Sequence, residues 1–451
     1  MIKKIFLFLL LISVPLIAQK QNFDRASYYS YGQKLFSEAH LLPYNDKDSI
    51  KIIIMFKTVY ESLIFVQVNP LDNPGNFQAI PFIEVFFKDE NGIIKNRVLW
   101  SDTVWAKDYD ETKSKNKFSA GYVEATLPNA DYKCTVQLLD RYKKPSEKND
   151  LTISTIKNNN KNTIYFDPIL TYSEEELPQY KSIPFILSNK INFNSKDTKI
   201  IIPLIYSKKY NVFNYNLKKI NSNEDNLWND SVNIWGRVYP SDNSKINVEK
   251  TNNLPVLLSI KTDKNIDVFN NEKQEGVLKI DLPKTGLSPG KYNLLLKNEN
   301  NLDSINYDFE VVWLDIPLSL RNPDYAIEMM YYILNDEEYN KMKDSDNDKK
   351  ADLIMKYWKQ KDPTKDTPYN EMMTEYFRRV DYAFFNYQTI QEKDGAKTER
   401  GKIYILFGKP DTIEKSIKDG LQSEIWIYKK NSKKFYFDLV SNGIYILTKI
   451  E

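Results

Sequence analysis

Residues that commonly carry catalysis or bind metals are scarce in this sequence. Its 451 residues include one histidine, one cysteine and 13 glycines. A lone His40 and a lone Cys134 exclude a zinc site of His and Cys ligands, a CxxC redox pair and an intramolecular disulfide. A Ser-His-Asp or Cys-His relay would have to run through His40, and no glycine-rich phosphate loop is present. We therefore predict no metal site and no cofactor, and we assign no catalytic residue.

Carboxylates and arginines in the C-terminal third remain as candidates for chemistry. Glu371, Glu375 and Arg379 follow one another at steps of four residues in a predicted helix, so they share one face. Such a group either locks helix, loop and sheet together through ion pairs and caps or forms a pocket for a polar ligand. The candidate set is Asp362, Asn370, Glu371, Glu375, Arg378, Arg379, Thr398, Glu399, Arg400 and Asp411.

Arg379 is the member of this set with the sharpest expectation. It lies beside an apolar stripe, so its guanidinium needs carboxylate partners. Glu375 is one helical turn earlier, and Glu399 or Asp411 is expected to reach in from the loops around the next strand. We expect a buried ion pair whose loss costs about 3 kcal/mol.

The N-terminus reads as a targeting segment. Lys3 and Lys4 precede an apolar run over residues 5–17, and Ala18 is a cleavage site of the expected type. We therefore expect a signal peptide over residues 1–18, a mature chain that starts at Gln19, and a periplasmic or secreted protein. Cleavage removes two lysines, which leaves 61 basic and 61 acidic residues. This neutral balance gives no electrostatic reason to expect nucleic acid as a partner, and no second apolar run reaches membrane-spanning length.

Short strands separated by turns dominate the sequence up to residue 317, which is typical of β-sandwiches. Residues 20–45 read as a leader strand or loop. Strands of a first sandwich are expected at 50–56, 62–68, 81–87, 93–100, 118–127 and 132–139. Those of a second sandwich are expected at 198–205, 232–239, 256–260, 277–282, 292–296 and 306–314.

Two segments of these sandwiches share one pattern. Leu127, Tyr132 and Val136 in the first segment correspond in spacing to Leu287, Tyr292 and Leu296 in the second. The pattern is typical of the corner of immunoglobulin-like sandwiches, where a buried tyrosine hydroxyl bonds back to the backbone. The alternative is two unrelated hairpins with the same turn chemistry. We expect Tyr132 and Tyr292 to be buried at equivalent corners.

Helical spacing replaces the strand pattern after residue 317. Helices are expected from Asn322-Pro323, over 336–343 and 351–359, and from Thr367-Pro368, which starts the longest one. Strands at 402–407, 424–428, 435–440 and 444–449 are then expected to form an antiparallel meander. The fold class is therefore mainly β, with two tandem immunoglobulin-like sandwiches followed by an α+β domain. The expected domains are 19–168, 169–317 and 318–451.

This last domain resembles the GWxTD domain family of exported bacterial proteins. The resemblance covers residues 320–451 and rests on Trp358, Asp362-Pro363-Thr364, Asn370-Glu371, Glu375-Tyr376, Arg378-Arg379-Val380, Gly395 to Ile405, Gly408-Lys409-Pro410-Asp411, Trp426 and Tyr428. The signature itself is altered. It reads Gly395-Ala396-Lys397-Thr398-Glu399, so the tryptophan is lost and the aspartate is a glutamate.

The resemblance implies architecture more than activity. We expect an exported cell-envelope binding or scaffold protein without catalytic activity, which docks a protein or envelope component through its C-terminal domain. The alternative is a carboxylate-based hydrolase of a glycan or peptide, because that chemistry needs no His, Cys or metal. A closed ion-pair network in the C-terminal domain would favour the binding or scaffold protein. A cleft with unpaired carboxylates would favour the hydrolase.

Overall fold

The computed structural model describes residues 33–451 except 45, 47, 70–72, 115–116, 140–143, 155–161, 176, 179, 221–227, 229, 251–254, 263–272, 301–302, 419–420 and 441–442. The expected signal peptide and the expected mature N-terminus at Gln19 lie outside the described residues. Strands account for 47% and helices for 19% of the structure, which confirms the mainly β class. The chain forms two compact units: a β unit, Tyr31–Trp313, and a C-terminal unit, Leu314–Glu451.

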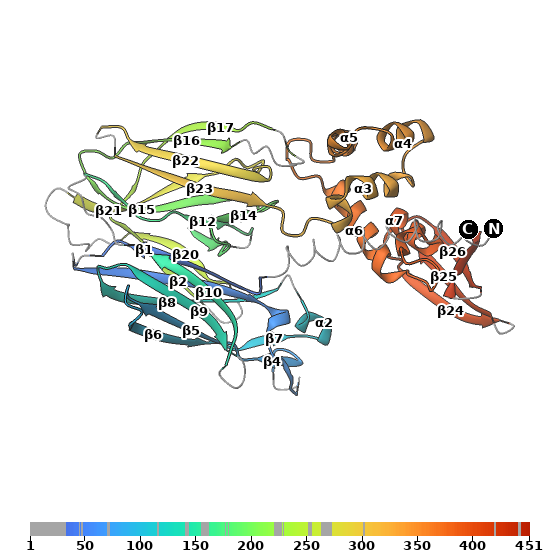
Figure 1. Cartoon of the computed structure of the whole chain (residues 1–451), viewed down its shortest axis with the longest axis horizontal. Coiled ribbons are helices and arrows are strands. Elements are labelled where there is room, and N and C mark those ends of the chain that lie inside the picture. The colour runs from blue at the N-terminus through green and yellow to red at the C-terminus, as the bar shows by residue number, and fades with distance from the viewer. Residues whose placement is uncertain are drawn as a thin grey trace, which may run out of the picture. The chain divides into compact units, whose positions relative to one another are not determined.

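Three antiparallel sheets make up the first half of the β unit (Figure 1). Their strand orders are β1-β2-β8, β10-β9-β5-β6 and β3-β4-β7. The elements are β1 (Leu35–Leu42), β2 (Ser49–Val59), η1 (Tyr60–Ser62), β3 (Val66–Gln67), β4 (Phe77–Ala79), β5 (Phe82–Lys88), β6 (Ile94–Ser101), β7 (Val104–Ala106), α2 (Tyr109–Thr112), β8 (Phe118–Pro128), β9 (Tyr132–Leu139) and β10 (Pro145–Ile153).

The strand expected over residues 62–68 is reduced to the two residues of β3. The Ser62 hydroxyl donates to the carbonyl of Val59 and turns the chain at η1. Ile64 and Val66 are more than half exposed, so this apolar run does not form part of a buried sheet. The prediction of a full strand was therefore wrong, because the serine turn ends the extended conformation.

The second half of the β unit contains a sheet of eight strands and one of five. The larger follows the order β18-β21-β15-β12-β13-β20-β19 with β11 paired to β15, and the smaller is β14-β23-β22-β16-β17. Their strands are β11 (Ile164–Tyr165), β12 (Ile169–Tyr172), β13 (Lys181–Pro184), β14 (Lys190–Asn192), β15 (Lys199–Ser207), β16 (Phe213–Ile220), β17 (Asn233–Val238), β18 (Ser241–Asp242), β19 (Ser244–Glu249), β20 (Leu257–Thr262), β21 (Lys273–Asp281), β22 (Gly290–Asn298) and β23 (Ser304–Val312).

Strand β2 is buried on both faces and joins two cores. Ile52 and Ile54 belong to the core of the first half, which also contains Cys134. Ile53 and Met55, which alternate with them and so point to the opposite face, pack in a second cluster with residues of the larger sheet such as Ile201. The two halves of the β unit therefore share apolar packing.

Both tyrosines of the shared pattern are buried and bond back to the backbone. Tyr132 and Tyr292 are 3% and 0% exposed. The hydroxyl of Tyr132 donates to the carbonyl of Pro128 at 2.9 Å, and that of Tyr292 donates to the carbonyl of Ser288 at 2.8 Å. Each bond reaches back four residues, so burial and hydrogen bonding of both tyrosines are confirmed.

The C-terminal unit begins with helices. These are η2 (Leu318–Arg321), α3 (Pro323–Met330), α4 (Asp336–Lys343), α5 (Asn347–Gln360), α6 (Glu371–Asn386), η3 (Gly395–Lys397) and α7 (Glu399–Phe407). Asn322 caps α3 as expected. The longest helix starts later than predicted, because Asn370 and not Thr367 is its cap: Asn370 accepts from the Met373 amide and donates to the Trp358 carbonyl.

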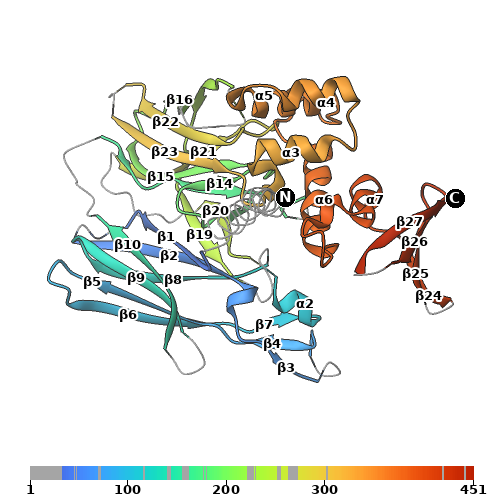
Figure 2. The ribbon, with the colours of Figure 1, turned by 45° about the vertical axis from the view of Figure 1, so that its right-hand side comes forward.

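A four-stranded antiparallel sheet completes this unit, in the order β24-β25-β26-β27 (Figure 2). Its strands are β24 (Thr412–Lys418), β25 (Leu421–Tyr428), β26 (Lys433–Leu439) and β27 (Tyr445–Ile450). The strand predicted over 402–407 is wrong, because this segment is helix α7. Thr398 caps it by accepting from the Gly401 amide, and Gly408, with φ of 79°, ends it. In the described part of the chain, no helix is long and apolar enough to cross a membrane.

Candidate functional site

The altered signature segment is packed too closely for larger side chains. A Cβ atom on Gly395 would lie 2.2 Å from the carbonyl oxygen of Ala383 in α6, and one on Gly401 would lie 2.0 Å from that of Gly395. Ala396 is completely buried, and its carbonyl accepts from the Tyr332 hydroxyl at 3.0 Å. The segment therefore fixes α7 against α6 and the turn that follows α3.

Asp394, immediately before the signature, is a buried carboxyl group that the sequence did not single out. Its Oδ1 accepts from the Tyr325 hydroxyl and from the Ala396 amide, both at 3.0 Å. Its Oδ2 lies 3.7 Å from Lys397 Nζ and accepts no hydrogen bond among the described residues. Burial raises the pKa of Asp394 to about 6, although the charge of Lys397 opposes the shift.

Arg400 connects α7 to the sheet. Its guanidinium lies 3.4 Å from Oε2 of Glu424 on β25 and 3.9 Å from the ring centre of Tyr445 on β27. Glu424 also accepts from the indole N–H of Trp426 at 3.2 Å. The side chains of Arg400 and Glu424 are 16% and 6% exposed, so this is the most buried ion pair made by any residue of the candidate set.

Arg379 differs from the expectation in its partners and in its burial. It pairs with Glu375 at 2.7 Å, but the two side chains are 28% and 56% exposed. Glu399 instead accepts from the amide of Leu447, and Asp411 accepts from the amide of Lys429. The two loop carboxylates are thus used to fix their own strands, so the expected bridge through Arg379 is wrong.

The other candidates lie at separate places in the unit. Arg378 pairs with Asp315. The Thr364 hydroxyl donates to Glu371 at 2.6 Å and lies 3.3 Å from Asp362, so it brings these two carboxylates together. Asn370 and Thr398 cap α6 and α7. The candidate set therefore forms several local contacts and does not converge on one cavity.

Sequence reasoning missed Asp394, which is buried, and Asp381, which is partly buried. Asp381 accepts from the amides of Leu318 and Ser319 at 2.6 and 2.8 Å, and burial raises its pKa to about 6. Nothing in the sequence marks Asp381, whereas Asp394 precedes the family signature directly. Within the described residues, no group of three or more His, Cys, Asp or Glu side chains could hold a metal ion.

Strand β24 is one of the two edge strands of the C-terminal sheet, and β27 is the other. Strand β24 pairs with β25 only in the part of the sheet that the structure describes, and every side chain from Thr412 to Ile417 is exposed. Ile413 and Ile417 point to the same face, with 43% and 78% of their surface accessible, and Leu421 of β25, which pairs with Lys418, is 60% exposed. An edge with free backbone groups and apolar side chains is a surface that pairs with another strand.

We predict that Arg400→Ala lowers the unfolding free energy of the C-terminal unit by about 2 kcal/mol, because the buried Glu424 then keeps only the exposed Lys415 and the indole N–H of Trp426 as partners. The more exposed Arg379 pair is the matched control, and Arg379→Ala should cost about 1 kcal/mol or less. Unfolding of the full chain in urea, a denaturant that adds no salt, measures the loss of unfolding free energy in both variants. Equal losses for the two variants would contradict this assignment.

A second prediction concerns the pH dependence of Asp394. An aspartate in the unfolded chain titrates near 3.8, and Asp394 titrates near 6 when folded. Between these values the folded state binds more protons, so rising pH destabilises it, and the loss is complete above the folded pKa. The Asp394→Asn variant keeps an acceptor oxygen but has no carboxyl group to titrate. It therefore does not lose stability in this way as the pH rises.

The stability of Asp394→Asn relative to wild type should therefore rise by about 2 kcal/mol from pH 4 to pH 7. Urea unfolding at a series of pH values measures this difference. The exposed Asp352→Asn in α5 is the control and should show no such trend. A difference for Asp394→Asn that stays constant with pH would show that the carboxyl group is not perturbed.

Comparison with known protein families finds a match for one part of the chain. Residues 295–445, about a third of the sequence, match the family model of the GWxTD domain. This confirms the resemblance over residues 320–445 and extends the matched region back to residue 295. A search of the curated proteins finds no match to the chain.

Proposed function

Because residues 295–445 carry a GWxTD domain, we propose that the protein is an exported cell-envelope binding protein without catalytic activity. In this proposal, the C-terminal unit docks an extended segment of a partner polypeptide along β24. The observation that carries the proposal is the exposed edge of β24, with Ile413 and Ile417 on one face.

The chemistry of this edge suits strand addition. A polypeptide segment that lies beside β24 gains main-chain hydrogen bonds from the unpaired side of the strand, and its alternate side chains meet the apolar positions. Lys415 and Glu414 sit between the two isoleucines, and Lys415 lies 3.6 Å from Glu424. The mixed charge favours a polypeptide over a strongly charged polymer as the occupant.

The carboxylates of the candidate set support a binding protein over a hydrolase. Two-carboxylate hydrolysis needs both groups to face one substrate. Glu375 is paired with Arg379, Glu371 accepts from Thr364, and Glu399 accepts from a backbone amide. These contacts orient the groups toward their own elements, so the alternative of a glycan or peptide hydrolase has less support.

The tyrosine corners support an immunoglobulin-like class for the two sandwiches. Tyr132 and Tyr292 make the same backbone contact four residues earlier. We propose on this basis two tandem domains over 19–168 and 169–317, ahead of the C-terminal domain at 318–451.

Replacing both isoleucines should test docking directly. We expect Ile413→Ser combined with Ile417→Ser to lose most binding to the partner captured from the native envelope by the wild-type chain, because the apolar contacts of the edge disappear. Ile64→Ser, which alters an equally exposed isoleucine of the β unit, is the control. Hydrogen exchange with the purified partner should show protection of the β24 amides. Protection at other elements, or equal capture by the double variant, would refute the proposal.

Export is a separate prediction. We expect the mature chain to begin at Gln19 and to be recovered from the periplasm or medium, because residues 1–18 have the pattern of a signal peptide. N-terminal sequencing of the protein purified from its native host, with fractionation of the cells, measures both. A chain that keeps Met1 in the cytoplasmic fraction would contradict the prediction.

A further inference from the structure

The outer face of the sheet β14-β23-β22-β16-β17 is rich in amide side chains. Leu217, Tyr292 and Leu294 are buried on the inner face, so the residues that alternate with them point outward. Figure 1 shows β17, β16, β22 and β23 side by side. The strand registers place two rows across the outer face, which together form the amide face: Trp235, Asn216, Leu295 and Asn306 in the first row, and Asn233, Lys218, Asn293 and Asp308 in the second.

Hydrogen bonds between the strands orient these amides. Asn216 Nδ2 donates to Asn233 Oδ1 at 2.7 Å. Asn293 Nδ2 donates to Asn306 Oδ1 at 2.8 Å and to Asp308 Oδ1 at 2.6 Å. An amide side chain has two N–H donors and one acceptor oxygen. Asn233 and Asn306 are exposed and use only their oxygens in these bonds, so their N–H groups point to a place where a ligand can accept from them.

Trp235 ends the first row on the edge strand β17. It is 69% exposed, and Tyr239, which follows the same strand, is 57% exposed. The ammonium group of Lys218 lies 5.9 Å from the centre of the indole ring. Neighbouring strands lie about 4.8 Å apart, so the row from Trp235 to Asn306 is about 14 Å long. The amide face therefore joins a flat apolar ring to a track of hydrogen-bonding groups.

This combination matches an uncharged ligand with many hydroxyl groups. The first row contains no charged residue, and the two charged residues of the second, Lys218 and Asp308, have opposite signs. A nucleic acid or another polyanion would need a basic face. Each hydroxyl group donates and accepts, as amides do. The C–H groups on one side of a pyranose ring pack against an indole, whose face carries partial negative charge.

We propose that the amide face binds an uncharged oligosaccharide along the row from Trp235 to Asn306. One sugar ring stacks on the Trp235 indole. Hydroxyl groups of the following rings accept from the Nδ2 groups of Asn233 and Asn306 and donate to the Asp308 carboxylate. The length of the row suits several linked rings better than a single sugar. This site belongs to the β unit and is independent of docking at β24.

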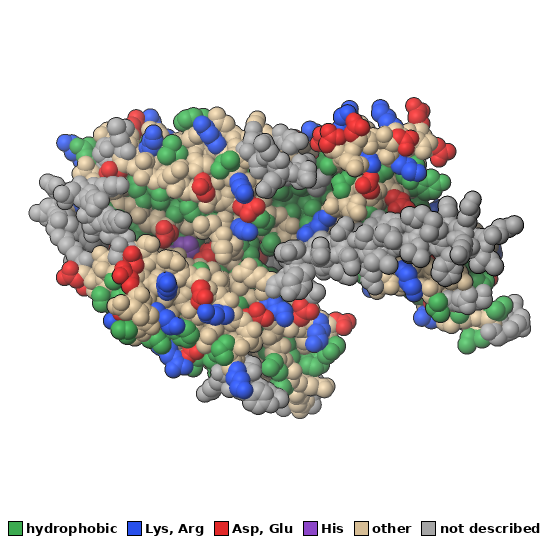
Figure 3. Space-filling model, in the orientation of Figure 1, with side chains coloured by type: hydrophobic (Ala, Val, Ile, Leu, Met, Phe, Trp, Pro, Cys, Tyr) green, Lys and Arg blue, Asp and Glu red, His purple; other side chains and the backbone are tan. Residues whose placement is uncertain are grey.

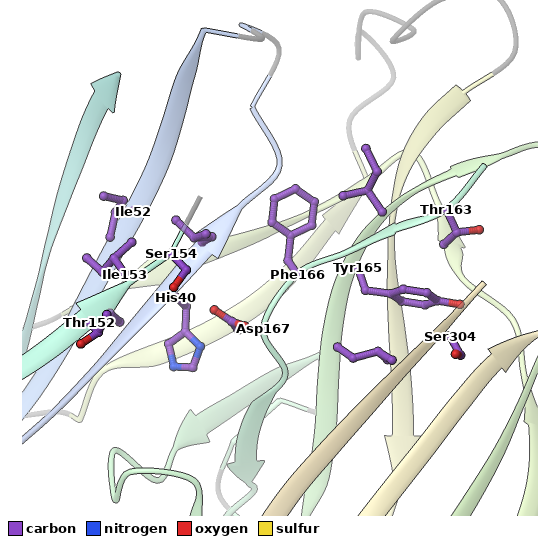
Figure 4. Close-up of a pocket in the computed structure, with 14 residues that line it drawn as sticks. His40, Ile52, Thr152, Ile153, Ser154, Thr163, Tyr165, Phe166, Asp167 and Ser304 are labelled. Atoms are coloured by element: carbon purple, nitrogen blue, oxygen red, sulfur yellow. The ribbon is translucent and has the colours of Figure 1, made fainter. Parts of the chain in front are cut away.

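A cavity of about 430 Å³ in the same unit is the other place where a sugar has to be looked for. Figure 4 shows His40, Tyr165 and Asp167 among the residues that line it. His40 is the only histidine of the chain, coloured purple in Figure 3. Its nuclear magnetic resonance signals are therefore unambiguous and report on a ligand in the cavity.

Isothermal titration calorimetry of the full chain with cellohexaose, xylohexaose and mannohexaose tests the proposal. We expect saturable binding of at least one of these hexasaccharides. Trp235→Ala should weaken that binding by about tenfold or more. Tyr109→Ala is the matched control and should leave it unchanged, because Tyr109 is 61% exposed and also lies near a lysine, but on α2. Asn306→Ala should weaken binding by about threefold or more, whereas Asn300→Ala, in the turn after β22, should not.

The His40 signals should stay in place while the hexasaccharide saturates the wild-type chain. Movement of these signals together with an unchanged affinity in Trp235→Ala would assign the sugar to the cavity and overturn the proposal. Three further results would also overturn it: no saturable binding of any of the three hexasaccharides, tighter binding of the anionic hexagalacturonate than of all three, or equal losses of affinity in Trp235→Ala and Tyr109→Ala.

Discussion

The sheet β1-β2-β8 has apolar contacts on both faces, and the organisation of the β unit depends on this burial. A sheet without a solvent face needs a strand that is apolar at consecutive positions, which β2 provides from Ile52 to Phe56. Polar groups on such a sheet must find partners inside the protein. Glu38 on β1 does so through His40 and the amides of Leu187 and Asn189, so one carboxylate joins the first half to the second.

Much of the strand pattern could be predicted, because alternation and turn chemistry are local properties. Strand β9 was expected at the residues where it lies, and the tyrosine hydrogen bonds followed from spacing alone. Segment 402–407 was misassigned, since its alternating isoleucines suit a strand, whereas Thr398 and Gly408 make it a helix. Strand β24 was missed because it is mostly polar, and only pairing with β25 makes it a strand.

The contacts of the candidate residues were harder to predict than the residues themselves. Glu375 and Arg379 meet because four residues on a helix are one turn, which sequence shows directly. The partner of Arg400 is 24 residues away on β25, and the partner of Arg378 is 63 residues away. Such pairs depend on how helix and sheet pack. Glu38 and His40, by contrast, are two residues apart on β1, so their shared face follows from period-two alternation once residues 35–42 are known to form a strand.

Ala396 stands where the family signature has tryptophan, and its surroundings limit how this sequence can change. The residue is completely buried, and the backbone of Gly395 beside it is in contact with α6. An indole ring at position 396 would have to displace that helix or α7. Introducing a tryptophan at position 396 would therefore require compensating substitutions in several elements, so the order in which they are made decides whether each intermediate chain keeps this packing.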